Sequence, residues 1–88
     1  PLAWHPDLAS DGKNRVVVVW DSMAGLLPEV SFSESSDNGQ SWTPPARLSP
    51  AGKPATHPQI VHMNGRFRVF WTTLYPDKPA TAESALIP

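Results

Sequence analysis

The distribution of apolar and polar residues along the chain predicts β-strands. The run RVVVVW at Arg15–Trp20 is rich in β-branched residues and ends in an aromatic one, which is typical of a strand. Because this run is apolar at every position after Arg15, we expect both of its faces to be covered. The segment EVSFSES at Glu29–Ser35 alternates instead, with Val30 and Phe32 on one face and serines on the other. This alternation predicts a half-buried strand.

Short segments rich in turn-forming residues separate these strands. SDGKN at Ser10–Asn14 and DNG at Asp37–Gly39 are both expected to turn the chain, since Asn and Gly adopt positive φ at little cost. The segment DSMAGLLP at Asp21–Pro28 is interpreted as a loop, with a short helical turn as the alternative. Each predicted strand is therefore bounded by a predicted turn or loop.

Two shorter segments complete a pattern of four strands. HPDLA at His5–Ala9 is a strand candidate with Leu8 as its apolar anchor. ARLS at Ala46–Ser49 is expected to form a fourth, outer strand. It follows Pro44 and Pro45, which fit an edge position because a missing N–H costs no ladder hydrogen bond there.

The first part of this pattern recurs later in the chain. HPDLASDGKNRVVVVW, which begins at His5, returns as HPQIVHMNGRFRVFW at His57–Trp71. The two His-Pro pairs lie 52 residues apart, and the Trp residues that end the two copies lie 51 apart, so one turn residue is lost. A repeat of about 50 residues with four short strands is the signature of a β-propeller blade.

The second copy preserves the apolar pattern of the first but stops short. Three of its residues share a face, in register with three of the first copy: Phe67, Val69 and Trp71 with Val16, Val18 and Trp20. AESALI at Ala82–Ile87 is a candidate third strand, and no fourth segment follows it. We therefore expect one complete blade at residues 1–53 and a partial blade at residues 54–88.

Composition favours an all-β fold. Eleven prolines spread through 88 residues leave almost no window for a helix of about ten residues. Four Trp and several Val and Phe clusters require burial, which excludes the disordered class. A chain this short buries only roughly 60–65% of its unfolded surface, and with no cysteine it has no disulfide to support it. The core is therefore expected to be thin.

Charge and the length of the apolar runs exclude two classes of partner. Seven Lys and Arg stand against eight Asp and Glu, and the basic residues form no stripe, so we expect no nucleic-acid binding. No apolar run approaches the roughly 20 residues that cross a bilayer, so we expect no membrane span. The chain begins with Pro1 rather than Met, as a processed product or a fragment would.

The stretch SSDNGQSW carries a defined spacing. Ser35-x-Asp37-x-Gly39-x-x-Trp42 resembles the Asp-box, a hairpin motif (35–42) of sialidase-like β-propellers, also known as BNR repeats. The order of the strands around the motif is also similar, and the resemblance covers nearly the whole chain. It implies about two four-stranded antiparallel blades, the second incomplete.

The resemblance also implies a structural role for these residues. Asp37 would accept hydrogen bonds from N–H groups of its own turn, and Gly39 would supply the positive-φ corner. Ser35 would add a hydroxyl bond across the turn, so that Trp42 is held against the sheet and largely buried. A calcium loop is excluded, because Pro45 stands where such a loop requires a bidentate Glu.

The repeated histidines are the candidate ligand-binding residues. In a propeller, His5 and His57 would each begin the innermost strand of a blade, near the channel where ligands bind. The alternative is that each ring only packs against the neighbouring blade. His57 and His62 are five apart, which places them on opposite faces of a strand, and there is no cysteine pair. We therefore expect no metal site and no cofactor.

Sialidase chemistry requires residues that this chain does not bring together in sequence. That chemistry uses an arginine cluster for the substrate carboxylate and a Tyr nucleophile. Arg66 and Arg68 are expected to face solvent, opposite the apolar face of their strand. The single tyrosine, Tyr75, lies in a segment flanked by proline. We expect no catalytic residues in this chain.

The resemblance implies a role in binding. We expect a non-catalytic pair of Asp-box blades that belongs to a larger or oligomeric propeller, with carbohydrate or protein as its ligand. Its partners would be further blades of the same chain or of other chains. One alternative is a fragment of a sialidase or related glycoside hydrolase, and another is a two-blade lectin that closes a ring as an oligomer. The expected location is secreted or periplasmic.

Overall fold

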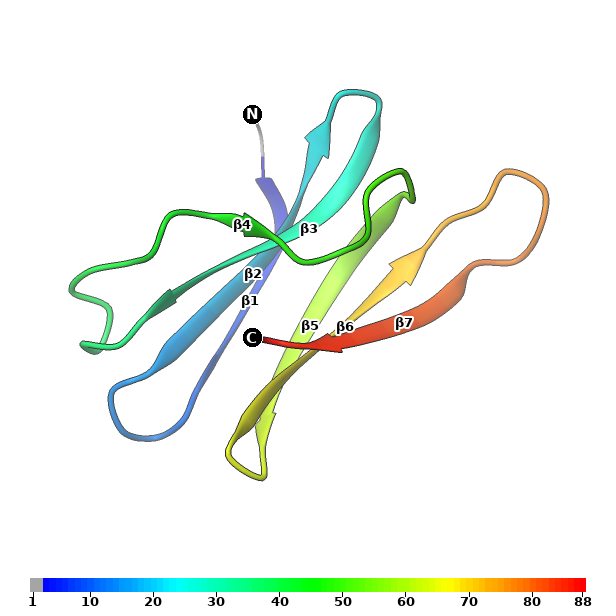
Figure 1. Cartoon of the computed structure of the whole chain (residues 1–88). Helices are drawn as coiled ribbons and strands as arrows, with labels where there is room; N and C mark the ends of the chain where they lie inside the picture. Colours follow the sequence, from blue (N-terminus) through cyan, green and yellow to red (C-terminus); the bar gives the residue numbers. More distant parts are fainter. Residues whose placement is uncertain (1–2) are drawn as a thin grey trace.

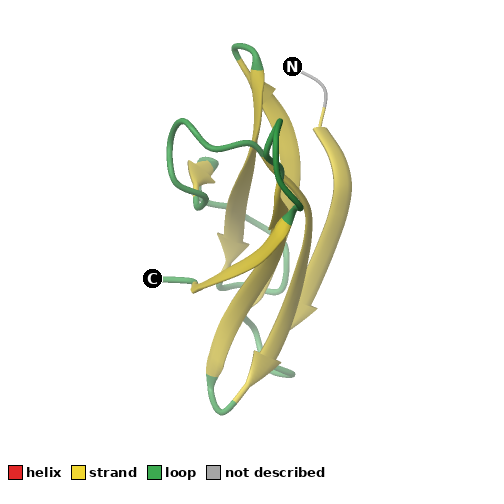
Figure 2. Ribbon diagram, turned by 90° about the vertical axis from the view of Figure 1, so that its right-hand side faces the viewer, coloured by secondary structure: helices red, strands yellow, loops and turns green. Residues whose placement is uncertain are grey.

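A computed structural model describes residues 3–88, and these residues form two antiparallel β-sheets (Figure 1). The all-β prediction is confirmed, and Figure 2 shows strands joined by turns and loops. None of the described residues forms a helix, so none forms one that could cross a membrane. The strands are β1 (Ala3–Ser10), β2 (Val16–Ala24), β3 (Leu27–Ser35), β4 (Ala46–Arg47), β5 (Ala55–Met63), β6 (Arg66–Thr73) and β7 (Thr81–Leu86).

The first sheet has four strands in the order β1-β2-β3-β4. The loop predicted at Asp21–Pro28 is wrong, because β2 continues to Ala24 and pairs there with Leu27 of β3. A two-residue turn joins these strands, and Gly25 at its first position has φ +66°. This positive φ at the first central residue matches the tight hairpin turns that suit the twist of antiparallel strands. The edge strand β4 is confirmed, although only two of its residues pair with β3.

The second sheet has three strands in the order β5-β6-β7. Asn64 and Gly65 form its first hairpin turn, both with positive φ, and Met63 pairs with Arg66 across it. The candidate third strand at the C-terminal end is confirmed as β7, which pairs with β6 from Thr73 to Arg68. Within residues 3–88, no further strand pairs with β7, so it forms an edge of the sheet.

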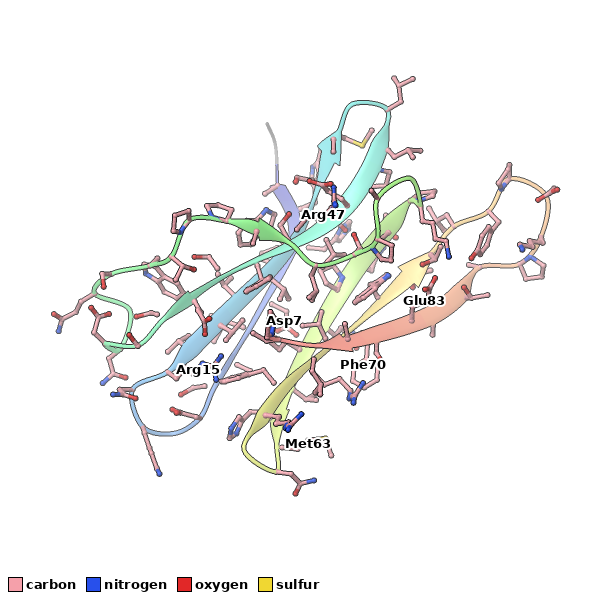
Figure 3. The ribbon with its side chains drawn as sticks, viewed as in Figure 1. Asp7, Arg15, Arg47, Met63, Phe70 and Glu83 are labelled. Carbon is pink, nitrogen blue, oxygen red and sulfur yellow. The ribbon has the colours of Figure 1, made fainter. Side chains whose placement is uncertain are left out.

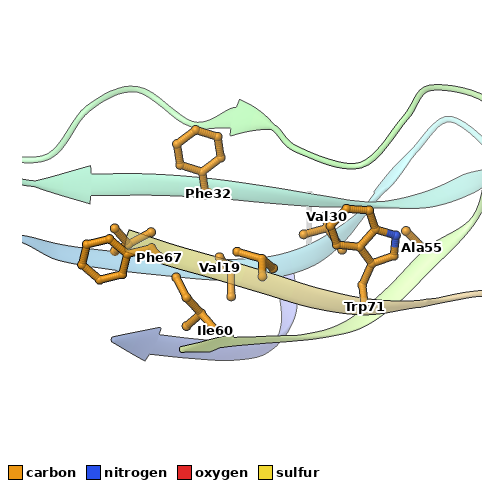
Figure 4. Packing of buried hydrophobic residues seen from close by; sticks show 9 residues of the cluster. Val19, Val30, Phe32, Ala55, Ile60, Phe67 and Trp71 are labelled. Atoms are coloured by element: carbon orange, nitrogen blue, oxygen red, sulfur yellow. The ribbon is translucent and has the colours of Figure 1, made fainter. Parts of the chain in front are cut away.

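The hydrophobic core lies between the two sheets. β5 packs against β1, β2 and β3, and side chains from both sheets meet there (Figure 4). The first sheet contributes Val17, Val19, Val30 and Phe32; the second contributes Ala55, Ile60, Phe67, Val69 and Trp71. The two sheets therefore share one core, and neither could bury these residues alone.

The repeated apolar residues are not covered equally in the two sheets. Phe67, Val69 and Trp71 of β6 are buried against the first sheet. In β2 the valines at positions 17 and 19 are the buried ones, whereas Val16, Val18 and Trp20, on the opposite face of that strand, are only half-buried. The expectation that both faces of this run are covered is therefore wrong, because the second sheet covers only one face.

Strand β3 is buried on both faces rather than half-buried. Val30 and Phe32 face the core as predicted, but the serines between and beyond them are also buried. The segment that follows the turn covers them: the Ser33 hydroxyl donates to the Thr43 carbonyl (2.6 Å), and the Val30 N–H donates to Ser49 Oγ (2.9 Å). Serines suit this face because their hydroxyls satisfy nearby backbone groups.

Candidate binding site at two histidine bulges

Each sheet has a β-bulge at its His-Pro pair. The pairing of β1 with β2 shifts register between Trp4 and Asp7, and the pairing of β5 with β6 shifts between Thr56 and Gln59. In both cases the histidine has a positive φ, 52° in one and 56° in the other. The proline that follows has no N–H to donate, so the ladder must break at this point. A non-glycine residue with positive φ is unusual and costs free energy, so a bulge repeated in both sheets is a specific feature.

The two bulges bring the predicted ligand-binding residues together. The ring centroids of His5 and His57 lie 3.8 Å apart, and the ring planes are tilted by 32°. Both residues are exposed to solvent. The sequence places these residues 52 positions apart, and the packing of β5 against β1 places their rings in contact.

A buried carboxylate lies beneath the two rings. Asp21, near the middle of β2, is only 2% exposed. Its Oδ2 atom accepts a hydrogen bond from Nδ1 of His5 (2.8 Å) and another from the backbone N–H of His57 (2.7 Å). A buried carboxylate is costly unless such donors compensate it, and these two donors come from different sheets. Asp21 therefore joins the bulges to each other.

The sequence interpretation did not identify Asp21 as a site residue because it placed this residue in a loop. A signal was present: Asp21 continues the alternation of Val17 and Val19, which both face the core. A charged residue in phase with buried valines indicates a buried carboxylate that needs partners.

A second carboxylate also spans the two sheets. Oδ2 of Asp7 accepts a hydrogen bond from the backbone N–H of Ile60 (3.0 Å), and its Oδ1 accepts from the N–H of Leu8. Figure 3 shows Asp7 where the two sheets meet. The two bulges line a surface hollow of about 310 Å³, formed by His5, Pro6, Asp7, His57, Pro58 and Gln59. This hollow offers imidazole, carboxylate and amide groups within a small area.

The turn between β3 and β4 has the hydrogen bonds expected from its sequence. Ser35 Oγ accepts from the N–H groups of Asp37 (3.2 Å) and Gly39 (2.8 Å) and donates to Asp37 Oδ1 (2.7 Å). Asp37 Oδ1 also accepts from the N–H of Ser41 (2.9 Å), and its Oδ2 accepts from the Ser41 hydroxyl. Asn38 and Gly39 both have positive φ. These bonds, with that from the Ser41 side chain foremost, lower the pKa of Asp37 to about 2.

The prediction that the tryptophan of this turn is largely buried is wrong. Trp42 is 45% exposed, and its indole Nε1 donates to the carbonyl of Gly39 (3.0 Å). A Cβ atom at Gly39 would lie 3.7 Å from the indole ring. The ring therefore folds back over its own turn, instead of inserting into the core. The turn and the indole support each other at the surface.

The arginines and the tyrosine lie apart from one another. Arg15 bonds Glu34 through Nε (2.8 Å) and lies over the Phe67 ring, 5.0 Å from its centroid. Figure 3 shows Arg15 and Arg47 at separate places on the molecule. Arg68 donates to Ser84 Oγ (3.1 Å) on the outward face of the second sheet, as expected for a solvated side chain. Tyr75 contacts the ammonium group of Lys78, 4.2 Å from the ring centroid.

Comparison of the chain with models of protein families, with curated proteins and with solved structures finds no match. The site is therefore interpreted from its own geometry and chemistry.

Proposed function

We propose that this chain is a non-catalytic pair of blades from a sialidase-like Asp-box propeller, and that it acts in a larger or oligomeric ring that binds carbohydrate or protein. The observation that carries the proposal is the repeated His-Pro bulge. The same unusual backbone feature occurs at the same place in two stacked sheets, 52 residues apart. Two copies of one unit, stacked in sequence, are the elementary step of a propeller.

The uncovered faces of the two sheets support the addition of further blades. The face of β2 with Val18 and Trp20 is the repeat equivalent of the β6 face that the first sheet covers. In this chain it is only half-buried, and Leu8 on the neighbouring strand is 62% exposed. On the outward face of the second sheet, Val61 and Phe70 are also exposed. Contiguous apolar surface of this kind marks an interface.

A ring of several such units would cover these faces. The contact between the two sheets is heterologous, since one face of the first sheet meets a different face of the second. Heterologous contacts close into a ring when the rotation between units allows it. The next unit would be another copy of this chain or a further segment of a longer one. The proposed location of this parent is secreted or periplasmic.

The hollow at the bulges would then hold the ligand. Its imidazole nitrogens, carboxylate and amide can donate and accept hydrogen bonds, which suits the hydroxyl groups of a carbohydrate. In NMR titrations with neutral and acidic oligosaccharides, we expect the imidazole signals of His5 and His57 to shift. The signals of His62, which contacts Phe67 instead, serve as the control. Shifts of His62 alone, or no shift with any sugar, would contradict a carbohydrate site here.

The assembly is tested by light scattering after gel filtration. We expect a closed oligomer, whose mass is a whole-number multiple of the 9.6 kDa of the single chain and larger than it. Leu8→Lys, on the uncovered face, should weaken this species, whereas Leu26→Lys, at a hairpin tip that is 92% exposed, should leave it intact. A monomer that unfolds cooperatively, with a midpoint independent of concentration, would rule out the proposed assembly.

A further inference from the structure

The cluster beneath the hollow contains three side chains that metals commonly bind. His5, Asp21 and His57 each offer one ligand atom, and these atoms all lie within 4.8 Å of one another. They come from three strands, β1, β2 and β5, and from both sheets. The sequence interpretation considered His57 with His62 and missed this group, because only the fold brings its members together.

We propose that His5, Asp21 and His57 form a binding site for a divalent transition metal of the zinc type. Imidazole nitrogen and carboxylate oxygen are both ordinary zinc ligands. Two histidines and one carboxylate supply three ligands, which leaves a fourth position open toward the hollow. The proposal does not rest on the propeller assignment, because all three residues belong to the chain described here.

The geometry requires only a small adjustment to hold a metal. Ligand atoms about 2.0–2.1 Å from zinc in tetrahedral geometry lie roughly 3.3–3.4 Å apart. His5 Nδ1 and Asp21 Oδ2 are 2.8 Å apart, so this pair must open by about half an ångström. The hydrogen bond that now joins them would be lost, because a neutral imidazole that binds the metal through Nδ1 carries its proton on Nε2 instead. The His57 ring must move inward, and as an exposed side chain it has room to do so.

The backbone around the cluster supports this arrangement. The N–H of His57 donates to Asp21 Oδ2, and such a bond orients a carboxylate as outer partners do in metal sites. The two bulges fix the backbone from which both imidazoles extend. Because the ligands belong to two sheets, a bound metal would also join the sheets and raise the stability of the chain.

The test uses the full 88-residue chain and two metals. Zinc binding is measured by calorimetry, and cobalt binding by its visible absorption, which reports tetrahedral nitrogen and oxygen coordination. We expect one metal per chain. His57→Ala and Asp21→Asn should each weaken binding by about 10-fold or more. His62→Ala is the matched control, and it should bind as tightly as the unmodified chain.

The binding measurements on the variants can overturn the proposed metal site only if these variants remain folded. Circular dichroism checks that each variant is folded, and if Asp21→Asn is not, His5→Gln at the exposed rim takes its place. Absence of binding up to about 1 mM metal would overturn the proposal. So would binding that survives His57→Ala and is lost in His62→Ala. Neither result bears on the light-scattering test, so the metal site and the assembly can fail independently.

Discussion

Two carboxylates of the first half of the chain, Asp21 in β2 and Asp37 in the turn after β3, illustrate opposite uses of one functional group. Asp21 is buried and accepts hydrogen bonds from two histidines of different sheets. Asp37 is exposed and accepts bonds only from its own turn. The first holds distant parts of the chain together, and the second fixes a local shape. Loss of the first should therefore weaken the contact between the two sheets, whereas loss of the second should weaken one turn.

Acid should weaken the turn at Asp37. Its pKa is lowered from an ordinary value of 3.8 to about 2, so the carboxylate is held more strongly in the folded chain than in the unfolded one. The stabilisation is complete above pH 3.8 and is lost as the pH falls through about 2. The urea concentration at the midpoint of unfolding should therefore decrease for the unmodified chain as the pH is lowered through this range.

Asp37→Asn provides the comparison for this prediction. This variant keeps the size of the side chain but loses the charge, so its midpoint should be lower at neutral pH and should change less between pH 4 and pH 2 than that of the unmodified chain. Asp77→Asn, in the exposed loop before β7, is the control and should retain the full acid dependence. Equal acid dependence in the Asp37 and Asp77 variants would contradict the assignment.

At the scale of the element, successive side chains of strand β6 point alternately into the core and toward solvent. Trp71 is 4% exposed against the first sheet, whereas its neighbour Phe70 is 42% exposed on the outward face. Trp71→Ala should lower the free energy of unfolding by about 3–5 kcal/mol through loss of packing. Phe70→Ala, the matched control one residue away, should cost about 1 kcal/mol or less. Chemical denaturation measures both, and similar costs would contradict the assigned faces.

The indole nitrogen of Trp71 allows a finer comparison. It is buried and has no hydrogen-bond partner among residues 3–88. A buried N–H without a partner costs about 1–3 kcal/mol, which offsets part of the packing of the ring. Trp71→Phe should therefore be much less destabilising than Trp71→Ala. A cost equal to that of the alanine variant would show that the indole nitrogen has a partner after all.

The sequence predicts the elements of this fold better than it predicts which faces are covered. The turns at Ser10–Asn14 and Asp37–Gly39 follow from residues that adopt positive φ, so the strands beside them are located well. The Gly25 turn lacks a polar neighbour, so its hairpin was interpreted as a loop. An all-valine strand has no alternation, and only the position of the second sheet decides which valines are buried.

The candidate site is likewise only partly predictable from the sequence. The two histidines of the site are found from the repeat alone, because a recurring His-Pro pair needs no structure to be noticed. The buried carboxylate beneath them requires the correct hairpin, since Asp21 faces the core only if β2 continues past Trp20. Trp42 is predicted from the sequence to be largely buried against the sheet, but its Nε1–H bonds the Gly39 carbonyl at the surface instead.

At the scale of the whole molecule, the functional groups of a sialidase do not converge. Arg15 is engaged with Glu34, Arg68 faces outward with Ser84, and Tyr75 contacts Lys78. We therefore expect no hydrolysis of a fluorogenic sialoside by this chain. The assay compares the chain with buffer and with Tyr75→Phe. A rate above buffer that the tyrosine variant abolishes would show that a catalytic site exists.

The shared core has a consequence for how the chain emerges from the ribosome. The first sheet is complete by Arg47, but the side chains that cover its core face arrive only with β5 and β6, which end at Thr73. At about 5–20 residues per second, the apolar face of the first sheet would remain uncovered for a few seconds during synthesis. A nascent chain stalled when Lys53 has just left the tunnel should therefore bind chaperones more strongly than one stalled after Pro88 has left it. Equal chaperone binding by the two would show that the first sheet protects its own face.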